Sequence, residues 1–201
     1  LLYNNQGQDS AVVATLLKEL DNRNPVSRGL LLPDGEAGPL QRVKKLLGFV
    51  PSWIEAFSAR ARKMRVLFSE SFLARFGDRE GFQPFLGDVD VRGQLVGRDP
   101  LHQSLYMWAK TALPGYILTM LGDRMEMAHS VEGRVPFLDH HVVEVIRSQP
   151  VNQKVRGMTE KYVLREAARD VITDTVYRRQ KHPFLSPPAT LNPDQRLNAF
   201  V

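Results

Sequence analysis

The stretch PGYILTMLGDRMEMAH, residues 114–129, decides the fold that the sequence predicts. Apolar side chains between Ile117 and Met127 occupy most of its helical circumference, and Pro114 stands where the first turn of a helix tolerates proline. A helix that is apolar on nearly every side is normally buried in the core. We therefore expect residues 114–129 to form a central helix against which the other elements pack.

Outward from this stretch, further segments show apolar residues at helical spacing, and no repeat or series of parallel strands interrupts them. The fold class predicted for this chain is therefore mainly α, in one helical domain. Residues 76–98, rich in glycine and mixed charge, predict an exposed loop. The helices predicted before this stretch are residues 9–21, residues 40–47, ending at Gly48, a helix from Ser52 with Trp53, Ile54, Phe57, Ala61, Met64 and Phe68 on one face, and residues 102–113 with Leu105, Trp108, Ala109 and Ala112 inward. Two helices are predicted after it. One is capped by Asp139 and carries Val142, Val145 and Ile146, and the other begins at Met158 or Thr159 with Val163, Leu164, Ala167, Ala168 and Val171 inward.

The composition excludes several classes of protein. The chain has no cysteine, which excludes disulfides, zinc–thiolate sites and a thiol nucleophile, and fits a reducing cytoplasm. No apolar run reaches the roughly 18 to 20 residues that cross a bilayer. The net charge of +5 is spread along the chain without the interleaved aromatics of a single-strand binding surface. We expect neither a membrane nor a nucleic acid as partner.

Charged residues in apolar surroundings mark the first candidate site: Asp123, Arg124, Glu132, Arg134 and Asp139. Such charges must be paired or face a cleft, because burying one alone costs several kcal/mol. Glu132 and Arg134, two residues apart in an extended segment, share one face. The residues alone leave two interpretations open: an ion-pair network that fixes the turn between two helices, or groups that face a ligand.

A second candidate is the cationic run of residues 178–181, RRQK, which follows the last strong helical pattern. It is placed to close over an anionic ligand, although an ordinary solvated loop has the same composition. His129, His140 and His141 lack the spacing of three or four residues that puts two metal ligands on one helix face. The adjacent pair should point to different sides of its helix, so we expect no metal site.

Three blocks of the sequence, in order and spacing, resemble the glutamine-hydrolysing asparagine synthetases. They are LGDRMEMAHSVEGRVPFLD (121–139), GMTEKYVLRE (157–166) and RRQK (178–181), followed by Phe184. The resemblance is strong over about residues 100–188 and compatible before them. It implies that residues 1–201 are the helical C-terminal portion of an α/β synthetase domain of the pyrophosphatase type, in a cytoplasmic protein that is a candidate homodimer.

The resemblance also implies an activity: ATP- and Mg²⁺-dependent amidation of aspartate to asparagine through β-aspartyl-AMP, with ammonia released from glutamine by an N-terminal domain. The family's S-G-G-x-D-S pyrophosphate loop and G-E-G-S-D-E segment are absent from this sequence, as is a glutaminase cysteine. We therefore expect the chain to be a fragment that is inactive alone, works with the missing domains, and holds no cofactor tightly.

The same resemblance assigns roles to individual residues. Lys181 matches the loop lysine that steadies phosphate charge during adenylation, and it is the catalytic residue we expect. Glu132, Arg134 and Arg179 are expected to shape the ATP and substrate site. The charges expected to be structural are Asp123, Arg124, Asp139, Lys161 and Arg165.

Two positions depart from the family's pattern. Pro183 stands where glycine is frequent, which should stiffen the loop, and Glu126 stands where a small polar residue is frequent. Two other interpretations of function stay open. Relatives of this family amidate or cyclise other carboxylic acids, and a helical module without catalysis would use its basic face to bind a partner or RNA.

Overall fold

The computed structural model describes residues 37–157 and 159–179, and this part is mainly helical, as predicted. The predicted helix 9–21 lies outside it. The elements up to α6 are α2 (Gln41–Leu47), α3 (Ser52–Lys63), the 3-10 helix η2 (Met64–Leu67), α4 (Glu70–Phe76), α5 (Gln83–Gly87), the π-helix η3 (Val91–Leu95) and α6 (Pro100–Lys110). The elements after α6 are the π-helix η4 (Leu113–Leu121), α7 (Asp123–Ala128), the 3-10 helix η5 (Pro136–Leu138), α8 (His140–Ser148), α9 (Val151–Lys154), β1 (Val155–Arg156), β2 (Thr159–Glu160), α10 (Tyr162–Ala168) and α11 (Asp174–Arg178).

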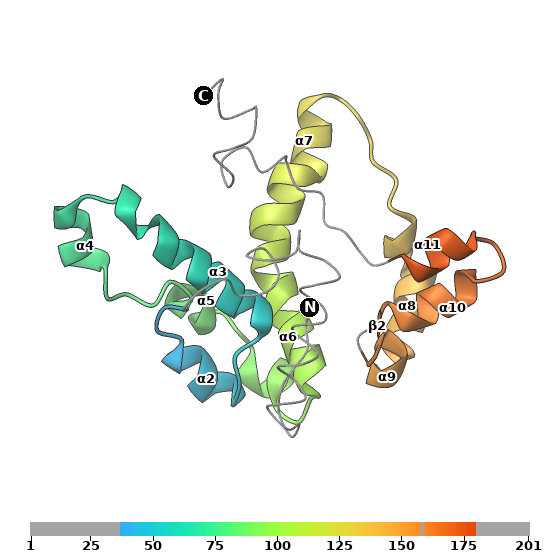
Figure 1. Cartoon of the computed structure of the whole chain (residues 1–201), viewed down its shortest axis with the longest axis horizontal. Helices are drawn as coiled ribbons and strands as arrows, with labels where there is room; N and C mark the ends of the chain where they lie inside the picture. The colour runs from blue at the N-terminus through green and yellow to red at the C-terminus, as the bar shows by residue number, and fades with distance from the viewer. Residues whose placement is uncertain (1–36, 158, 180–201) are drawn as a thin grey trace.

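The helices α6, η4 and α7 follow one another as a column (Figure 1). The elements α2 to α5 lie on one side of this column and α8 to α11 on the other, and an extended segment joins α7 to α8 (Figure 1). The sheet in the described residues is the antiparallel pair β1–β2, in which Val155 lies opposite Glu160 and Arg156 opposite Thr159. The parallel sheet of a pyrophosphatase-type fold therefore stays a prediction.

Local sequence explains how α2 and α3 form. Gly48 ends α2 in the left-handed conformation (φ 80°), which glycine adopts without steric cost, and its N–H donates to the carbonyl oxygen of Lys44 (2.8 Å). Pro51 then precedes α3, which begins at Ser52 as predicted. The apolar face predicted for the helix from Ser52 does not continue beyond the end of α3. Because α3 ends at Lys63, Met64 and Phe68 lie beyond it, and their exposed fractions are 49% and 46%.

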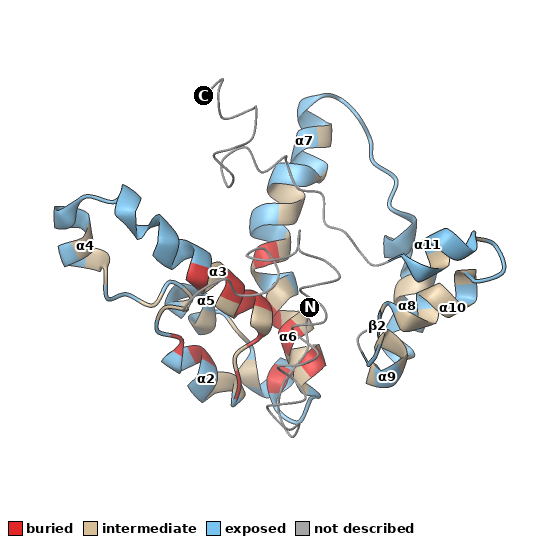
Figure 2. Ribbon diagram, viewed as in Figure 1, coloured by how far each residue is buried: buried red, intermediate tan, exposed pale blue. Residues whose placement is uncertain are grey.

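Trp53 lies at the centre of the core, which Figure 2 shows in red along α2, α3 and α6. Its indole ring packs edge-on against Phe57, Phe82 and Trp108, with ring centroids 5.8, 5.9 and 5.2 Å away. Its Nε1–H donates to Oγ of Ser104 (3.2 Å), and both side chains are buried. This hydrogen bond joins α3 to α6 and satisfies the one polar group that the indole brings into the core.

The buried face of α6 differs from the predicted one. Leu101, Ser104 and Met107 face the core, whereas Ala109 is exposed. Leu105 and Trp108 are only partly buried, and Ala112, beyond the end of α6, is buried as predicted. The prediction followed hydrophobicity and passed over Ser104, which is buried because it accepts the hydrogen bond of Trp53.

The prediction of a central helix over residues 114–129 is wrong for the described part of the chain. The stretch divides at Gly122 into η4 and α7, and none of its residues is buried. Periodicity shows which faces of a helix are apolar, but it does not show that other elements cover them. No helix in the described ranges is long and apolar enough to cross a membrane. The exposed large side chains along this stretch and the segment after it are Tyr116, Met120, Leu121, Met125, Met127, Val131, Val135, Phe137 and Leu138.

Two other expectations need correction. The segment 76–98 is mostly exposed, as expected, but it is not a single loop, because it contains α5 and η3 and its Leu95 is buried. The last long helix, α10, begins at Tyr162, because Thr159 pairs in β2 instead of starting the helix. Its predicted inward positions Leu164 and Val171 are exposed.

A contact between side chains links α6 to the elements after the column. The ammonium of Lys154, at the end of α9, donates a hydrogen bond to Nε2 of His102 (3.0 Å), which requires a neutral imidazole. The pKa of His102 lies below its usual value because burial disfavours the charged ring and because Lys154, and to a smaller extent Arg98, repel it; Asp99 acts in the opposite direction. The contact therefore depends on pH.

Replacing Ser104 by Ala should lower the free energy of unfolding by about 1–3 kcal/mol, because the buried indole N–H of Trp53 then has no acceptor. Chemical denaturation followed by tryptophan fluorescence measures this. Ser148→Ala is the control, since Ser148 is exposed and water replaces its bond to Val145. Equal effects of the two substitutions would contradict the assigned role of Ser104.

The His102 contact predicts how stability changes with pH. Because the pKa of His102 is lower in the folded chain than the ordinary value of 6.5, the unfolded chain binds the proton more readily, and stability present above that pH is lost as the pH falls below it. His102→Gln keeps an acceptor for Lys154 but does not titrate, so its free energy of unfolding should fall less between about pH 7.5 and about pH 5. If the free energy of unfolding of H102Q fell with pH as steeply as that of the wild type, this account would be ruled out.

Candidate functional site

The segment that carries the predicted charges leaves α7 along a defined path. Ser130 has a left-handed backbone (φ 56°), and the N–H of Val131 then donates to the carbonyl oxygen of Glu126 (2.9 Å). The carboxylate of Glu126 lies directly against Gly133, where a Cβ atom would collide with it. The carboxylate of Glu126 therefore occupies space that a side chain at position 133 would need.

Glu132 and Arg134 form an ion pair, as their shared face allowed. Nη2 of Arg134 lies 3.1 Å from Oε2 of Glu132, and the two side chains are 85% and 74% exposed. An ion pair so open to water contributes little stability, roughly 0–1 kcal/mol. These exposed groups are accessible to a ligand.

The other charges of this region contact backbone groups or solvent. Asp139 caps α8, as predicted, because its Oδ1 accepts the N–H groups of His141 (2.9 Å) and Val142 (3.4 Å). Asp123 lies in the first turn of α7, where its charge suits the helix dipole, and Arg124 is exposed beside it. In the part of the chain that the structure describes, the five predicted charges do not gather into one ion-pair network.

Arg165 connects the third block of the sequence to α10. Its Nε donates to the carbonyl oxygen of Glu160 (3.2 Å), and its Nη1 donates to those of Tyr177 and Arg179 (both 2.9 Å). The planar guanidinium thus fixes the C-terminal end of α11, where the cationic run begins. Lys161, which takes a left-handed backbone (φ 55°), forms the turn before α10.

A hydrogen bond between side chains supports the same end of α11. The phenol of Tyr177 donates to Oε1 of Glu166 (2.6 Å), which raises the pKa of Tyr177, with burial as a smaller cause. Arg169 lies over the ring of Tyr177, 5.4 Å from its centroid. These contacts lead the chain to Arg179, whose side chain is exposed; Lys181 lies outside the described residues, so its role stays a prediction.

The described residues do not by themselves offer a ligand set for a metal ion. They contain no cluster of three His, Cys, Asp or Glu side chains that could hold a metal. The sequence predicted that His140 and His141 point to different sides of α8. This is wrong, because the centroids of their rings lie only 3.8 Å apart. The accessible cations Arg134 and Arg179 suit phosphate, but neither lines the cavity described next.

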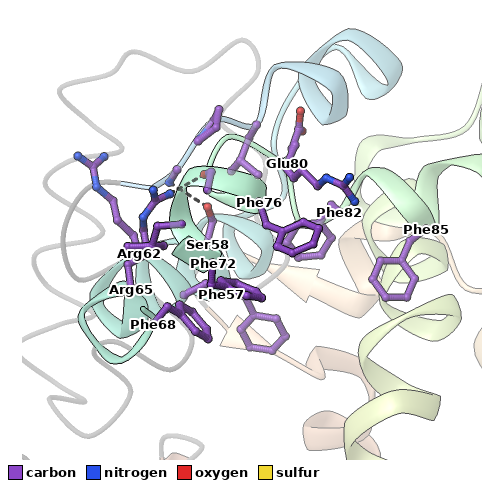
Figure 3. Close-up of a pocket in the computed structure, with 18 residues that line it drawn as sticks. Phe57, Ser58, Arg62, Arg65, Phe68, Phe72, Phe76, Glu80, Phe82 and Phe85 are labelled. Carbon is purple, nitrogen blue, oxygen red and sulfur yellow. Dashed lines mark hydrogen bonds between the residues drawn. The ribbon is translucent and has the colours of Figure 1, made fainter. Parts of the chain in front are cut away.

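A cavity of about 740 Å³ lies elsewhere, between α3, η2, α4 and α5, and sequence reasoning missed it. Phenylalanine rings form much of its wall: Phe68 and Phe72 stack with centroids 4.9 Å apart, and Phe76 follows at 5.0 Å (Figure 3). The spacing of 68, 72 and 76 is a helical signal that was available in the sequence. It was overlooked because α4 was not predicted and because Phe68 was assigned to the apolar face of the preceding helix.

Polar groups at this cavity come from η2 and from the loop between α4 and α5. Nη1 of Arg65 donates to the carbonyl oxygen of Gly77 (2.7 Å), and Arg79 lies over the Phe76 ring, 4.8 Å from its centroid. Glu80 accepts a hydrogen bond from the backbone N–H of Arg42 at Oε2 (3.4 Å). Its Oε1 is buried and has no hydrogen-bond partner among the described residues. None of the residues predicted for the site lines this cavity.

Comparison with known proteins relates these features to a family. Residues 17–201 match the asparagine synthase family. The amidase chry2 of Gibberella zeae is 39% identical over 115 residues, which are 54% of this chain and 16% of that amidase. The amidase chyE of Penicillium rubens is 36% identical over 115 residues, with the same shares of 54% and 16%. The glutamine-hydrolysing asparagine synthetase 3 of Bacillus subtilis is 39% identical over 72 residues, which are 36% of this chain and 11% of that protein.

The chain therefore spans 11–16% of the length of these relatives. No solved structure matches it significantly.

Replacing Arg165 by Lys should loosen the end of α11, because an ammonium cannot reach three carbonyl oxygens as the guanidinium fork does. Amide hydrogen exchange of residues 174–178 should become faster by about tenfold, the equivalent of ~1.4 kcal/mol. Arg147→Lys, on the exposed face of α8, is the matched control. Unchanged exchange in α11 would show that these carbonyl contacts do not hold it.

Proposed function

The chain belongs to the asparagine synthase family, and from that premise we propose that the protein forms an amide from a carboxylic acid in a reaction driven by ATP. The observation that carries the proposal is the family match over residues 17–201, which includes all three sequence blocks. In this reaction a carboxylate oxygen attacks the α-phosphate of ATP and pyrophosphate leaves. Ammonia then attacks the acyl carbon, and AMP leaves with the electron pair of the broken bond.

The roles proposed for this chain's residues follow from their charge and position. Lys181 neutralises charge on the phosphates, for which a point charge on a flexible stem is suited. Glu132 and Arg134 border the site as an ion pair, with Arg179 near the start of the loop. Arg165 positions that loop by holding the end of α11.

The described residues offer no ligand set for Mg²⁺, so we assign them no step that involves the metal. The sequence also lacks the family's pyrophosphate loop. We therefore propose that residues 1–201 alone do not turn over.

We propose aspartate as the acceptor acid and glutamine as the source of ammonia, because asparagine synthetases are among the similar proteins. A second candidate is amidation of another carboxylic acid. The similar proteins from Gibberella zeae and Penicillium rubens favour it, because both are named amidases. The two candidates share the adenylation chemistry and differ in the acid that is activated.

Lys181→Ala in the full-length protein should lower amide synthesis by about 10²–10³-fold, because charge that builds on the phosphates loses its counter-ion. Glutamine hydrolysis should be unchanged. AMP formation with aspartate and ammonia measures the first reaction, and glutamate release the second. Lys45→Ala, on the exposed face of α2, is the matched control; normal synthesis in the Lys181 variant would refute its assigned role.

The acceptor is identified by which acid supports AMP formation in the full-length protein. Aspartate should do so if the first candidate is right. AMP formation with other carboxylic acids but not with aspartate would select the second candidate, and its absence with every acid tested would remove both.

A further inference from the structure

We propose that Tyr177 and Glu166 are positioning residues for Lys181, because their hydrogen bond sets the direction in which the chain leaves α11. This inference rests on the function proposed above and adds two residues to it. The phenol of Tyr177 donates to Oε1 of Glu166 (2.6 Å), and both residues are partly buried. A hydrogen bond to a carboxylate is short and roughly twice as strong as one between neutral groups. The bond therefore suits a contact that holds two short helices in one arrangement.

Helix α11 depends on Tyr177 for its place against α10. It contains five residues, far fewer than the roughly 12 to 15 that an isolated helix needs to be stable. Tyr177 is its one residue that is not exposed to solvent in the described structure. The ion pair between Arg178 and Asp174 (3.2 Å) lies within α11, so it does not orient α11 against α10. The contacts of Tyr177 with α10 therefore determine how α11 is oriented.

Tyr177 is held at both of its ends. Its carbonyl oxygen accepts a hydrogen bond from Nη1 of Arg165 (2.9 Å), and its hydroxyl donates to Glu166, the next residue of α10. Arg169, which follows α10, lies over the ring between these two points, 5.4 Å from its centroid. One point of contact lets a helix rotate about it, but two points separated by the length of a tyrosine side chain do not. Arg165 therefore fixes the position of the end of α11, and the bond to Glu166 fixes its direction.

The end of α11 limits the space that Lys181 can reach. Lys181 follows Arg179 by two residues, and the carbonyl oxygen of Arg179 also accepts a hydrogen bond from Arg165 (2.9 Å). Two residues of extended chain span about 7 Å, so the backbone of Lys181 stays within roughly that distance of Arg179. Misplacing a reacting group by about 1 Å can cost on the order of 10²-fold in rate. A change in the direction of α11 is therefore enough to take the lysine off the phosphates.

A bond that only stabilised the fold would behave differently from a positioning bond. Loss of a purely structural bond lowers the rate whether or not the lysine is present. A positioning bond acts through Lys181, so its loss has no further effect once the lysine is absent. A double-mutant cycle between positions 177 and 181 separates the two roles.

The test measures AMP formation by the full-length protein with the carboxylic acid that supports it. Tyr177→Phe removes the donor and keeps the ring beneath Arg169. Because the lysine acts on charge that develops in the transition state, kcat should fall about tenfold while KM for ATP changes by less than about twofold. In the Lys181→Ala background, Tyr177→Phe should lower kcat no further. A normal kcat in Tyr177→Phe, or a similar loss in both backgrounds, would overturn the proposal.

Variants of the acceptor and a second tyrosine complete the test. Glu166→Gln keeps an oxygen that accepts from the phenol, so kcat should stay within about threefold of wild type, whereas Glu166→Ala should match Tyr177→Phe. Tyr162→Phe is the matched control, because the hydroxyl of Tyr162 accepts from Nη1 of Arg156 (2.7 Å) and has no part in the bond to Glu166. It should keep the wild-type kcat. Equal losses in the two Glu166 variants, or a tenfold loss in the control, would contradict the proposal.

The inference and the function on which it rests fail in different ways. If the wild-type protein forms no AMP with any acid, both are removed. If Lys181→Ala leaves AMP formation unchanged, the role of the lysine and its positioning are removed, but the amidation reaction is not. If Lys181→Ala lowers kcat and Tyr177→Phe does not, the positioning role of Tyr177 and Glu166 is removed alone.

Discussion

The hydrogen bond from Trp53 to Ser104 is the interaction on which the rest of the described structure depends. Among the described residues the indole is the largest buried side chain, and its N–H needs an acceptor where water cannot reach. Ser104 meets this need and thereby fixes the rotation of α6 against α3. The edges of the same indole position Phe57 and Phe82, so the aromatic cavity takes its inner wall from the core.

Elements whose signals are local were predictable from the sequence. Gly48 ends α2 and Asp139 caps α8 as expected, because a left-handed glycine and a capping carboxylate act on their own neighbours. The buried face of α6 was not predictable in this way, since it depends on a partner 51 positions away along the chain. The exposure of η4 and α7 was missed for a related reason: their sequence describes the helix surface but not what covers it.

The same distinction between local and long-range contacts applies to the candidate site. The pairing of Glu132 with Arg134 agrees with their spacing in an extended segment, and it was one of the two interpretations that the sequence left open. The three carbonyl oxygens held by Arg165 come from Glu160, Tyr177 and Arg179, and no spacing rule identifies them. The contact between the Glu126 carboxylate and Gly133 is another that no spacing rule identifies. Family membership then connects this turn to amide formation as a proposal.

The central claim is that the turn with Glu132 and Arg134 and the loop with Lys181 border one phosphate-binding site. The most direct measurement is an experimental structure of the full-length protein bound to a stable analogue of the acyl-adenylate. The account predicts the ammonium of Lys181 within about 3 Å of a phosphate oxygen, with the Glu132–Arg134 pair lining the same site. A structure in which the analogue binds with Lys181 beyond reach and the turn facing solvent would contradict it.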